Sequence, residues 1–255
     1  MKRLRRRPEL NMQKHDEPLL IELSKQIEQD GFALAPSAID AKTVTALVDA
    51  IDRVASAPGV RQRSRHIYAI RNLLQNVPAI RALANTHPVR STVESLVGLQ
   101  VVAVRGLFFD KTTRANWKVA WHQDLTIAVQ RKRHVPGFGP WSMKAGVQHV
   151  QPPVAVLEQM LTLRIHLDPS DESNGPLHVI PGSHRHGRLN AKAIREWTMR
   201  NTPRPCLVPK GGILIMRPLL LHASSQTLRP VHRRVIHLEF AAQSLPGRLR
   251  WFESS

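Results

Sequence analysis

Cysteine and long apolar runs are scarce in this sequence. Cys206 is the single cysteine in 255 residues, which excludes an internal disulfide and a cysteine-rich zinc site. No apolar run approaches the ~20 residues that a membrane-spanning helix needs. The basic start of the chain is not followed by the apolar segment of a secretory signal. These absences predict a cytoplasmic protein that does not span a membrane.

Acidic residues and tyrosine are also scarce. The chain has 19 acidic and 37 basic residues, a formal net charge of +18, and one tyrosine. Because five basic residues lie within the first seven, residues 1–17 are expected to form a flexible basic tail. A charge of this size is compatible with binding to nucleic-acid phosphates. The sequence has neither zinc-finger spacing nor an RNP-like aromatic motif, so nucleic-acid binding stays an alternative and not the first interpretation.

Helical periodicity dominates the first hundred residues. Residues 18–30 carry leucine and isoleucine at helical spacing, and Gly31 suits the end of that helix. Residues 32–35 are predicted to form a short strand. Asp40 is a suitable N-cap for the next helix, and residues 66–97 are predicted to form short helices broken by prolines.

Strand patterns dominate from residue 99 onward. Short apolar runs alternate with turn residues, which is typical of a β-sandwich or barrel and not of βαβ units. No repeat or low-complexity linker divides the chain, so residues 18–255 are predicted to form one mainly β domain with helices packed against it. The apolar runs cover residues 99–109, 161–167, 177–180, 213–216, 219–221 and 235–240.

Residues 130–153 interrupt the strand pattern with glycine, proline, tryptophan and lysine in no regular period. A long irregular loop within a domain is usually either functional or disordered. We predict a lid over the neighbouring site, with Trp141 and Lys144 as candidates to line the pocket. The basic residues of this segment indicate either an anionic substrate or an ordinary solvated loop, and both interpretations stay open.

His122 and Asp124 are the first candidates for metal binding. They follow a β-prone run and lie two residues apart, so an extended backbone would direct both side chains to one face. Two ligands do not make a strong site. The question is therefore which residue supplies a third.

His222 is the most suitable third ligand, because it ends an apolar run and opens into small polar residues. His184 and His186 lie in a loop beside Arg185, which would repel a cation, and we interpret that loop as a packing element. A metal site formed by these two histidines is the weaker alternative.

A second His-x-Asp pair, His166 and Asp168, competes with the first. Arg164 would share the face of His166, which counts against a cation there. Asp168 also precedes a proline and is typical of a turn start. We interpret both residues as structural or pocket-lining.

The resulting set of two imidazoles and one carboxylate, His122, Asp124 and His222, has the composition of the facial triad of non-haem Fe(II) oxygenases. Such a triad leaves coordination positions open for O2 and a chelating cosubstrate. Zinc would accept the same ligands, so the set alone does not identify the metal.

Several ordered motifs together resemble the phytanoyl-CoA dioxygenase-like family of Fe(II)/2-oxoglutarate oxygenases. Each motif alone is weak, but the ordered set covers about residues 18–243. The motifs are Gln29-Asp30-Gly31-Phe32, Trp121-His122-Gln123-Asp124, Asn174-Gly175-Pro176 through Pro181-Gly182-Ser183-His184, Gly211-Gly212-Ile213-Leu214-Ile215-Met216, His222-Ala223-Ser224, and Arg233 eleven residues beyond His222.

The resemblance implies a double-stranded β-helix, a cupin-type jelly roll, flanked by N-terminal helices. It implies that His122, Asp124 and His222 hold Fe(II), and that 2-oxoglutarate is a cosubstrate together with O2. Arg233 and Ser224 would bind the far carboxylate of 2-oxoglutarate, with Lys111 nearby.

The implied reaction is oxidative decarboxylation of 2-oxoglutarate to succinate and CO2, coupled to hydroxylation of a small organic molecule. Related halogenases replace the carboxylate ligand by a small residue. Asp124 is retained here, so hydroxylation is favoured.

The choice between Arg233 and Arg234 stays open on the residues alone. Arg presents a planar fork that matches a carboxylate. Ile236 and Leu238 alternate in phase with Arg234, so Arg234 would face inward if the apolar face lines the barrel. The family offset from His222 favours Arg233, and we predict Arg233 with Arg234 as the alternative.

Two other classes of protein remain as alternatives. One is a basic nucleic-acid-associated protein, for which the net charge would be the functional feature. The other is a non-catalytic cupin-like metal-binding protein. A degenerate binding protein is free to lose members of the site, whereas this chain retains His122, Asp124, His222 and Arg233.

Overall fold

The computed structural model describes residues 17–54, 57–63, 66–98, 100–228, 231–242 and 244–254. Apart from residue 17, which begins the first helix, the predicted basic tail lies outside the described residues. No helix in these described ranges is long and apolar enough to cross a membrane.

Seven α-helices and three short 3-10 turns are present in the described ranges. Asp40 caps the second helix as predicted, because its carboxylate accepts a hydrogen bond from the backbone N–H of Thr43. The helices are α1 (Glu17–Gln29), α2 (Ala41–Asp52), α3 (Leu73–Asn76), α4 (Pro78–Ala84), α5 (His87–Val97), α6 (Val154–Glu158) and α7 (Ala191–Arg200), with 3-10 turns at Glu172–Asn174, Ser183–His186 and Pro246–Arg248.

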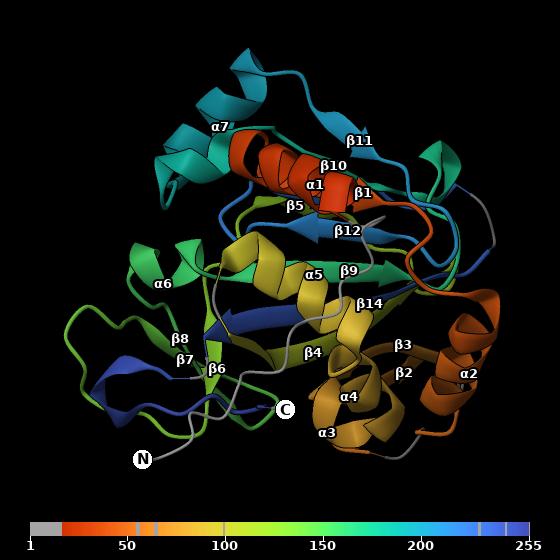
Figure 1. The fold of residues 1–255 in the computed structure, drawn as a ribbon, viewed down its shortest axis with the longest axis horizontal. Coiled ribbons are helices and arrows are strands. Elements are labelled where there is room, and N and C mark those ends of the chain that lie inside the picture. Colours follow the sequence, from red (N-terminus) through yellow and green to blue (C-terminus); the bar gives the residue numbers. More distant parts are fainter. Residues whose placement is uncertain are drawn as a thin grey trace, which may run out of the picture.

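A seven-stranded antiparallel sheet forms the larger wall of the protein, with the strand order β1-β12-β9-β14-β4-β3-β2. Helices α1 to α5 gather on one side of it (Figure 1). Its strands are β1 (Phe32–Ala35), β2 (Val60–Arg63), β3 (His66–Arg71), β4 (Val101–Lys111), β9 (Leu161–His166), β12 (Ile213–Met216) and β14 (Arg233–Ala242).

Two smaller sheets complete the β structure. One has the order β11-β10-β13-β5 and the other the order β6-β8-β7. With the large sheet they form the predicted jelly roll, so the expected fold class is confirmed. The strands are β5 (Val119–His122), β6 (Ile127–Val129), β7 (Trp141–Lys144), β8 (Val147–Val150), β10 (Leu177–Val179), β11 (Arg204–Cys206) and β13 (His222–Ser224).

The large sheet has one apolar and one polar face. Ile236, Leu238 and Phe240 of β14 are buried in the main hydrophobic cluster together with helix residues. Arg233, His237 and Glu239 alternate with them and line an interior cavity. The apolar face therefore contacts the helices, and the polar face lines the interior of the barrel. Arg234 would have been the inward arginine only if the apolar face lined the barrel, which it does not.

Three local predictions were wrong. Residues 219–221 form a turn and not a strand, and β13 begins after them at His222. Residues 66–71 form strand β3 and not a helix, because pairing with β4 outweighs the weak local helical pattern. Residues 130–153 are not wholly irregular, since β7 and β8 pair within them. Both strands are short and are joined by a turn at Ala145 and Gly146. Each strand has too few residues for an alternation of apolar and polar side chains to be recognised in the sequence.

Candidate active site

His122 and His222 face each other across two neighbouring strands. They are direct partners in the antiparallel pairing of β5 with β13. Direct partners on one face of a sheet bring their side chains together, and the two imidazole centroids lie 4.2 Å apart. Strand register thus juxtaposes two residues that are far apart in the sequence.

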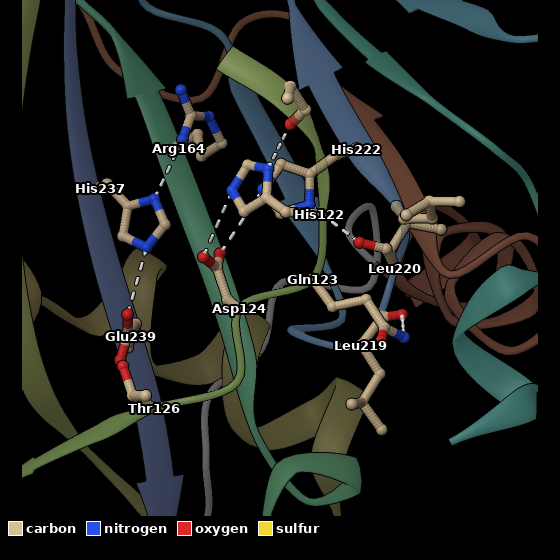
Figure 2. Close-up of polar contacts among 12 residues, drawn as sticks. His122, Gln123, Asp124, Thr126, Arg164, Leu219, Leu220, His222, His237 and Glu239 are labelled. Carbon is tan, nitrogen blue, oxygen red and sulfur yellow. Dashed lines mark hydrogen bonds and ion pairs between the residues drawn. The ribbon is translucent and has the colours of Figure 1, made fainter. Parts of the chain in front are cut away.

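Both imidazoles are oriented in the same way. Nδ1 of His122 lies 2.8 Å from the carbonyl oxygen of Ala120, and Nδ1 of His222 lies 2.8 Å from that of Leu220. A carbonyl only accepts, so each Nδ1 carries a hydrogen, and in the neutral ring that tautomer leaves the Nε2 lone pair for a metal. Figure 2 shows the two rings directed toward Asp124.

Asp124 completes the cluster from the loop after β5. Its Oδ1 lies 3.9 Å from Nε2 of His122, and its Oδ2 lies 3.7 Å from Nε2 of His222. Ligand atoms about 2.1 Å from one ion are separated by roughly 3–3.5 Å. The three residues can therefore each offer one ligand atom at close to the spacing that a bound divalent cation requires.

The charge balance around Asp124 also suits a cation. Burial alone would raise the pKa of its carboxyl, but His222, His237, His122 and Arg105 lower it to about 2. Asp124 Oδ2 is buried and has no hydrogen-bond partner among the described residues. An ionised carboxylate with an unsatisfied buried oxygen, facing two imidazole lone pairs, fits a metal ion.

Gln123 points away from the cluster and holds its strand in place. The side chain is buried, and its Nε2 donates to the carbonyls of Gly187 and Leu219 at 2.8 and 2.7 Å. Its Oε1 accepts from the backbone N–H of Leu189 at 2.8 Å. One amide thus ties the His-x-Asp segment to two loops, a role that no local pattern in the sequence predicts.

Replacing Gln123 by alanine is expected to lower the free energy of unfolding by about 2–4 kcal/mol. Each loop group that loses its partner while buried costs roughly 1–3 kcal/mol. Urea unfolding would measure the change. Gln130→Ala, at an exposed glutamine in the segment that follows, is the matched control and should stay within about 0.5 kcal/mol of the wild type. Equal free energies of unfolding for the two variants would contradict the proposed role of Gln123.

The cavity that contains His122, Asp124 and His222 is also lined by three buried basic side chains. Lys111, Arg164 and Arg233 all line it, and each has less than a tenth of its surface exposed. Burial first, and then Arg164, lower the pKa of Arg233 to about 9; burial, Arg233 and Arg164 lower that of Lys111 to about 7. No carboxylate among the described residues forms an ion pair with Lys111, Arg164 or Arg233. An anionic ligand would supply the missing charge.

Ser224 and Lys111 are in contact within this cavity. Lys111 Nζ donates to Ser224 Oγ at 2.9 Å and to the carbonyl of Ser225 at 2.5 Å. The Arg233 guanidinium donates to the carbonyl of Gly175, while its Nε has no partner in the described part of the chain. The three residues predicted to bind 2-oxoglutarate are thus gathered in one place.

Arg234 has a different environment. Its Nε and Nη2 both donate to the Asp168 carboxylate at 2.8 Å, and its backbone N–H donates to the same group. The alternative arginine is therefore engaged in a bidentate ion pair. The same pair explains Asp168 of the second His-x-Asp motif as a structural residue.

The remaining candidate histidines lie away from the triad. His166 is buried, and its pKa lies well below the usual range because of burial, Arg164 and Arg233. His184 packs so closely against Gly31 that a Cβ at that position would collide with the imidazole ring. His184 therefore secures the end of α1, in agreement with the predicted packing loop.

A second His-Asp-His group lies near the starts of β3 and β14 and the end of β4. His66 Nε2 and His232 Nδ1 contact Asp110 Oδ2 at 2.8 and 2.7 Å, and Asp110 Oδ1 accepts from the backbone N–H of Arg233. These atoms already satisfy one another through hydrogen bonds. The group therefore fits a hydrogen-bonded clamp on the start of β14.

Several cavity residues were not anticipated from the sequence. Arg105 donates to Glu239 at 2.9 Å, and Arg164 Nη1 lies 3.0 Å from His237 Nδ1. Figure 2 shows His237 between Arg164 and Glu239, beside Asp124. The signal for Arg164, His237 and Glu239 was a polar alternation on strands β9 and β14, visible only once the apolar face is assigned to the helices. Arg105 lies on β4.

The two predicted lid residues differ in position. Nζ of Lys144 lies 3.4 Å from the hydroxyl oxygen of Thr126, a residue two positions beyond Asp124. Trp141 packs against the apolar cluster that contains Val129 and Val150. Lys144 therefore approaches the site, whereas Trp141 anchors the hairpin.

The jelly roll with its His-Asp-His cluster defines the class of non-haem iron oxygenases. The sequence profile of the phytanoyl-CoA dioxygenase family (PhyH) matches residues 27–235. The chain belongs to the phytanoyl-CoA dioxygenase family and is an Fe(II)/2-oxoglutarate-dependent dioxygenase, which confirms the resemblance. No curated protein sequence matches it significantly.

Solved structures with the same fold include EctD from S. alaskensis, crystallised with 2-oxoglutarate and 5-hydroxyectoine. It has 18% identity and a TM-score of 0.68, and the match covers 94% of this chain and 79% of EctD. The carbocyclase SnoK from nogalamycin biosynthesis has 16% identity and a TM-score of 0.68, with 91% and 85% covered. The epimerase SnoN from nogalamycin biosynthesis has 17% identity and a TM-score of 0.64, with 91% and 92% covered. At these identities the likeness concerns the fold.

Proposed function

We propose that this enzyme hydroxylates a small, anionic organic molecule, with release of succinate and CO2 from 2-oxoglutarate. The observation that supports it most is the lining of one cavity. It contains both the metal-ligand cluster and three buried basic side chains without carboxylate partners among the described residues. A dicarboxylate that chelates the metal needs both features.

In this proposal His122, Asp124 and His222 hold Fe(II), and the Nδ1–carbonyl hydrogen bonds keep both imidazoles in the binding tautomer. When bound, the iron supplies O2 activation coupled to decarboxylation of the cosubstrate. Arg233 forms the ion pair with the far carboxylate of 2-oxoglutarate, and Lys111 with Ser224 donates to the same group. These residues orient the cosubstrate and replace its hydration shell.

Residues 18–255 are proposed to act as one catalytic domain, with the segment 130–153 as a cover over the entrance to the cavity. The position of Lys144 beside Thr126 supports this role. Exclusion of water by such a cover protects a reactive centre from side reactions.

Anaerobic addition of Fe(II) and 2-oxoglutarate tests the proposal. The chelate of the two is expected to produce a visible charge-transfer band that neither produces alone with the protein. Absence of the band with correctly folded protein would favour a non-catalytic metal-binding protein. Salt-sensitive binding of DNA or RNA without any succinate formation would favour the nucleic-acid alternative.

A further inference from the structure

A second, larger cavity adjoins the active site. Its volume is about 540 Å³, against about 130 Å³ for the cavity that contains the triad. Phe109 and Trp117 line both, so the two cavities share a wall. The larger volume lies in the range of pockets that accept a complete organic molecule. The smaller one suits a cosubstrate.

A β-bulge in strand β3 builds one wall of the larger cavity. Arg61 pairs with Ala69 and Gln62 pairs with Ile67, so Tyr68 is the extra residue. Ile67 is buried in the main hydrophobic cluster, whereas Tyr68 and Ala69 line the cavity. The bulge thus turns an aromatic side chain toward the cavity.

The cavity is positively charged. Arg61, Arg63 and Arg71 line it, the first two exposed at the rim and Arg71 half-buried. Arg71 stands opposite Leu107 in the sheet, and Leu107 lines the triad cavity. No described residue forms an ion pair with Arg71, and burial, followed by Arg105 and Arg61, lowers its pKa. Its guanidinium is therefore available to an anion.

The cavity also offers aromatic surfaces. Tyr68 and Trp117 meet edge to face, with ring centroids 6.1 Å apart. Lys111 Nζ lies 5.7 Å from the centre of the Trp117 ring. Trp117 therefore stands between the predicted cosubstrate cations and the larger cavity. Flat apolar groups pack well on such rings.

We propose that the cavity lined by Arg71, Tyr68 and Trp117 binds the substrate, an organic anion with an aromatic or similarly flat apolar body. Its carboxylate or phosphate pairs with Arg71, and its body lies on the aromatic rings between that arginine and the triad. That this ligand is the substrate rests on the proposed function. The binding of such anions in this cavity does not depend on that function.

Isothermal titration of the metal-free, full-length protein with three naphthalene probes tests the site. The probes are 2-naphthoate, 2-naphthyl phosphate and the neutral 2-naphthamide. Both anions should bind at least about tenfold more tightly than the amide, since a hydrogen-bonded charge adds this much or more. The tighter anion identifies the preferred head group.

Three variants separate the contributions. Arg71→Ala should weaken both anions about 10- to 100-fold and leave the amide unchanged. Tyr68→Ala should weaken all three probes by similar factors, because it removes only the aromatic surface. Arg195→Ala, at an exposed arginine of α7, is the charge-matched control and should bind like the wild type. Circular dichroism of each variant verifies folding.

Equal affinity for the amide and the anions would overturn the proposal, as would unchanged anion binding by Arg71→Ala. Displacement of the probes by saturating 2-oxoglutarate would also overturn it, because the probes would then occupy the Lys111 and Arg233 site. If the proposed function fails, the result is different. The charge-transfer band of Fe(II) and 2-oxoglutarate is then absent, while the probes still bind in a way that depends on Arg71.

Discussion

Asp124→Ala is expected to lower Fe(II)-dependent formation of succinate from 2-oxoglutarate by at least about a thousandfold. The substitution removes the one carboxylate of the cluster and leaves the two imidazoles. Metal-ion stabilisation amounts to several kcal/mol, and each ~1.4 kcal/mol is a factor of ten. The product can be quantified directly as succinate, without knowledge of the organic substrate.

The Asp124→Ala protein should still fold. No described group forms a hydrogen bond with the Asp124 side chain, whose nearest ionic contacts are 3.7 and 3.9 Å away. A ligand that binds only the native state raises the unfolding temperature. Fe(II) should therefore stabilise the wild type against heat and have little effect on the variant.

His222→Ala should behave like Asp124→Ala in both measurements. Asp49→Ala, at an exposed aspartate of α2, should retain wild-type activity and the thermal response to Fe(II). Undiminished succinate formation by Asp124→Ala would show that the metal lies elsewhere. The group of His66, Asp110 and His232 would then be the next candidate.

The parts of the site that could be predicted from the sequence are those carried by local spacing. His122 and Asp124 are two residues apart, and an extended backbone is sufficient to place them together. His222 required a family resemblance, because its distance from His122 depends on the pairing of β5 with β13. Strand pairing between such distant segments has no local sequence signal.

The inward face of the large sheet could not be derived in the same way. Alternation along β14 separates Arg233 from Arg234 but does not say which set faces the helices. Apolar residues face whichever layer excludes water, and here that layer is the helical one. The interior of the barrel is polar because it binds ligands, so the usual expectation of an apolar interior fails at this site.

The hairpin within residues 130–153 shows a different limit. Lys144 and Val147 are the first paired residues of this hairpin, and only Ala145 and Gly146 lie between them. Both of these turn residues have a positive φ. Glycine suits such a turn, but alanine gives no signal for it. The tertiary contacts of Trp141 with the apolar cluster around Val150 support the strand instead.

Arg233→Ala is expected to raise the KM for 2-oxoglutarate about a hundredfold or more, whereas Arg234→Ala should change it less than about threefold. A hydrogen bond to a charged partner is worth roughly 1.5–3 kcal/mol, and a bidentate guanidinium pair forms two. Arg234 already donates two side-chain hydrogen bonds to the Asp168 carboxylate. Succinate formation at varied 2-oxoglutarate concentration measures both values.

The two substitutions should have opposite effects on stability without ligand. Burial lowers the pKa of Arg233 to about 9 in the folded protein. The buried charge therefore lowers the stability of the folded state. This destabilisation is fully present below the folded pKa and disappears above the higher pKa of the unfolded chain. Arg233→Ala should therefore melt at or above the wild-type temperature, while losing stabilisation by 2-oxoglutarate. Arg234→Ala breaks a bidentate ion pair that is only partly exposed and should melt lower.

A reversed order of the two KM values would identify Arg234 as the anchor. Asp168→Ala then serves as an internal check, because it releases Arg234 without touching Arg233. Under the proposed assignment it should reproduce the lower melting temperature of Arg234→Ala and leave the KM for 2-oxoglutarate unchanged. The clamp of Asp110 on the backbone of Arg233 supports the same conclusion, since that hydrogen bond holds the start of β14 so that Arg233 lines the triad cavity.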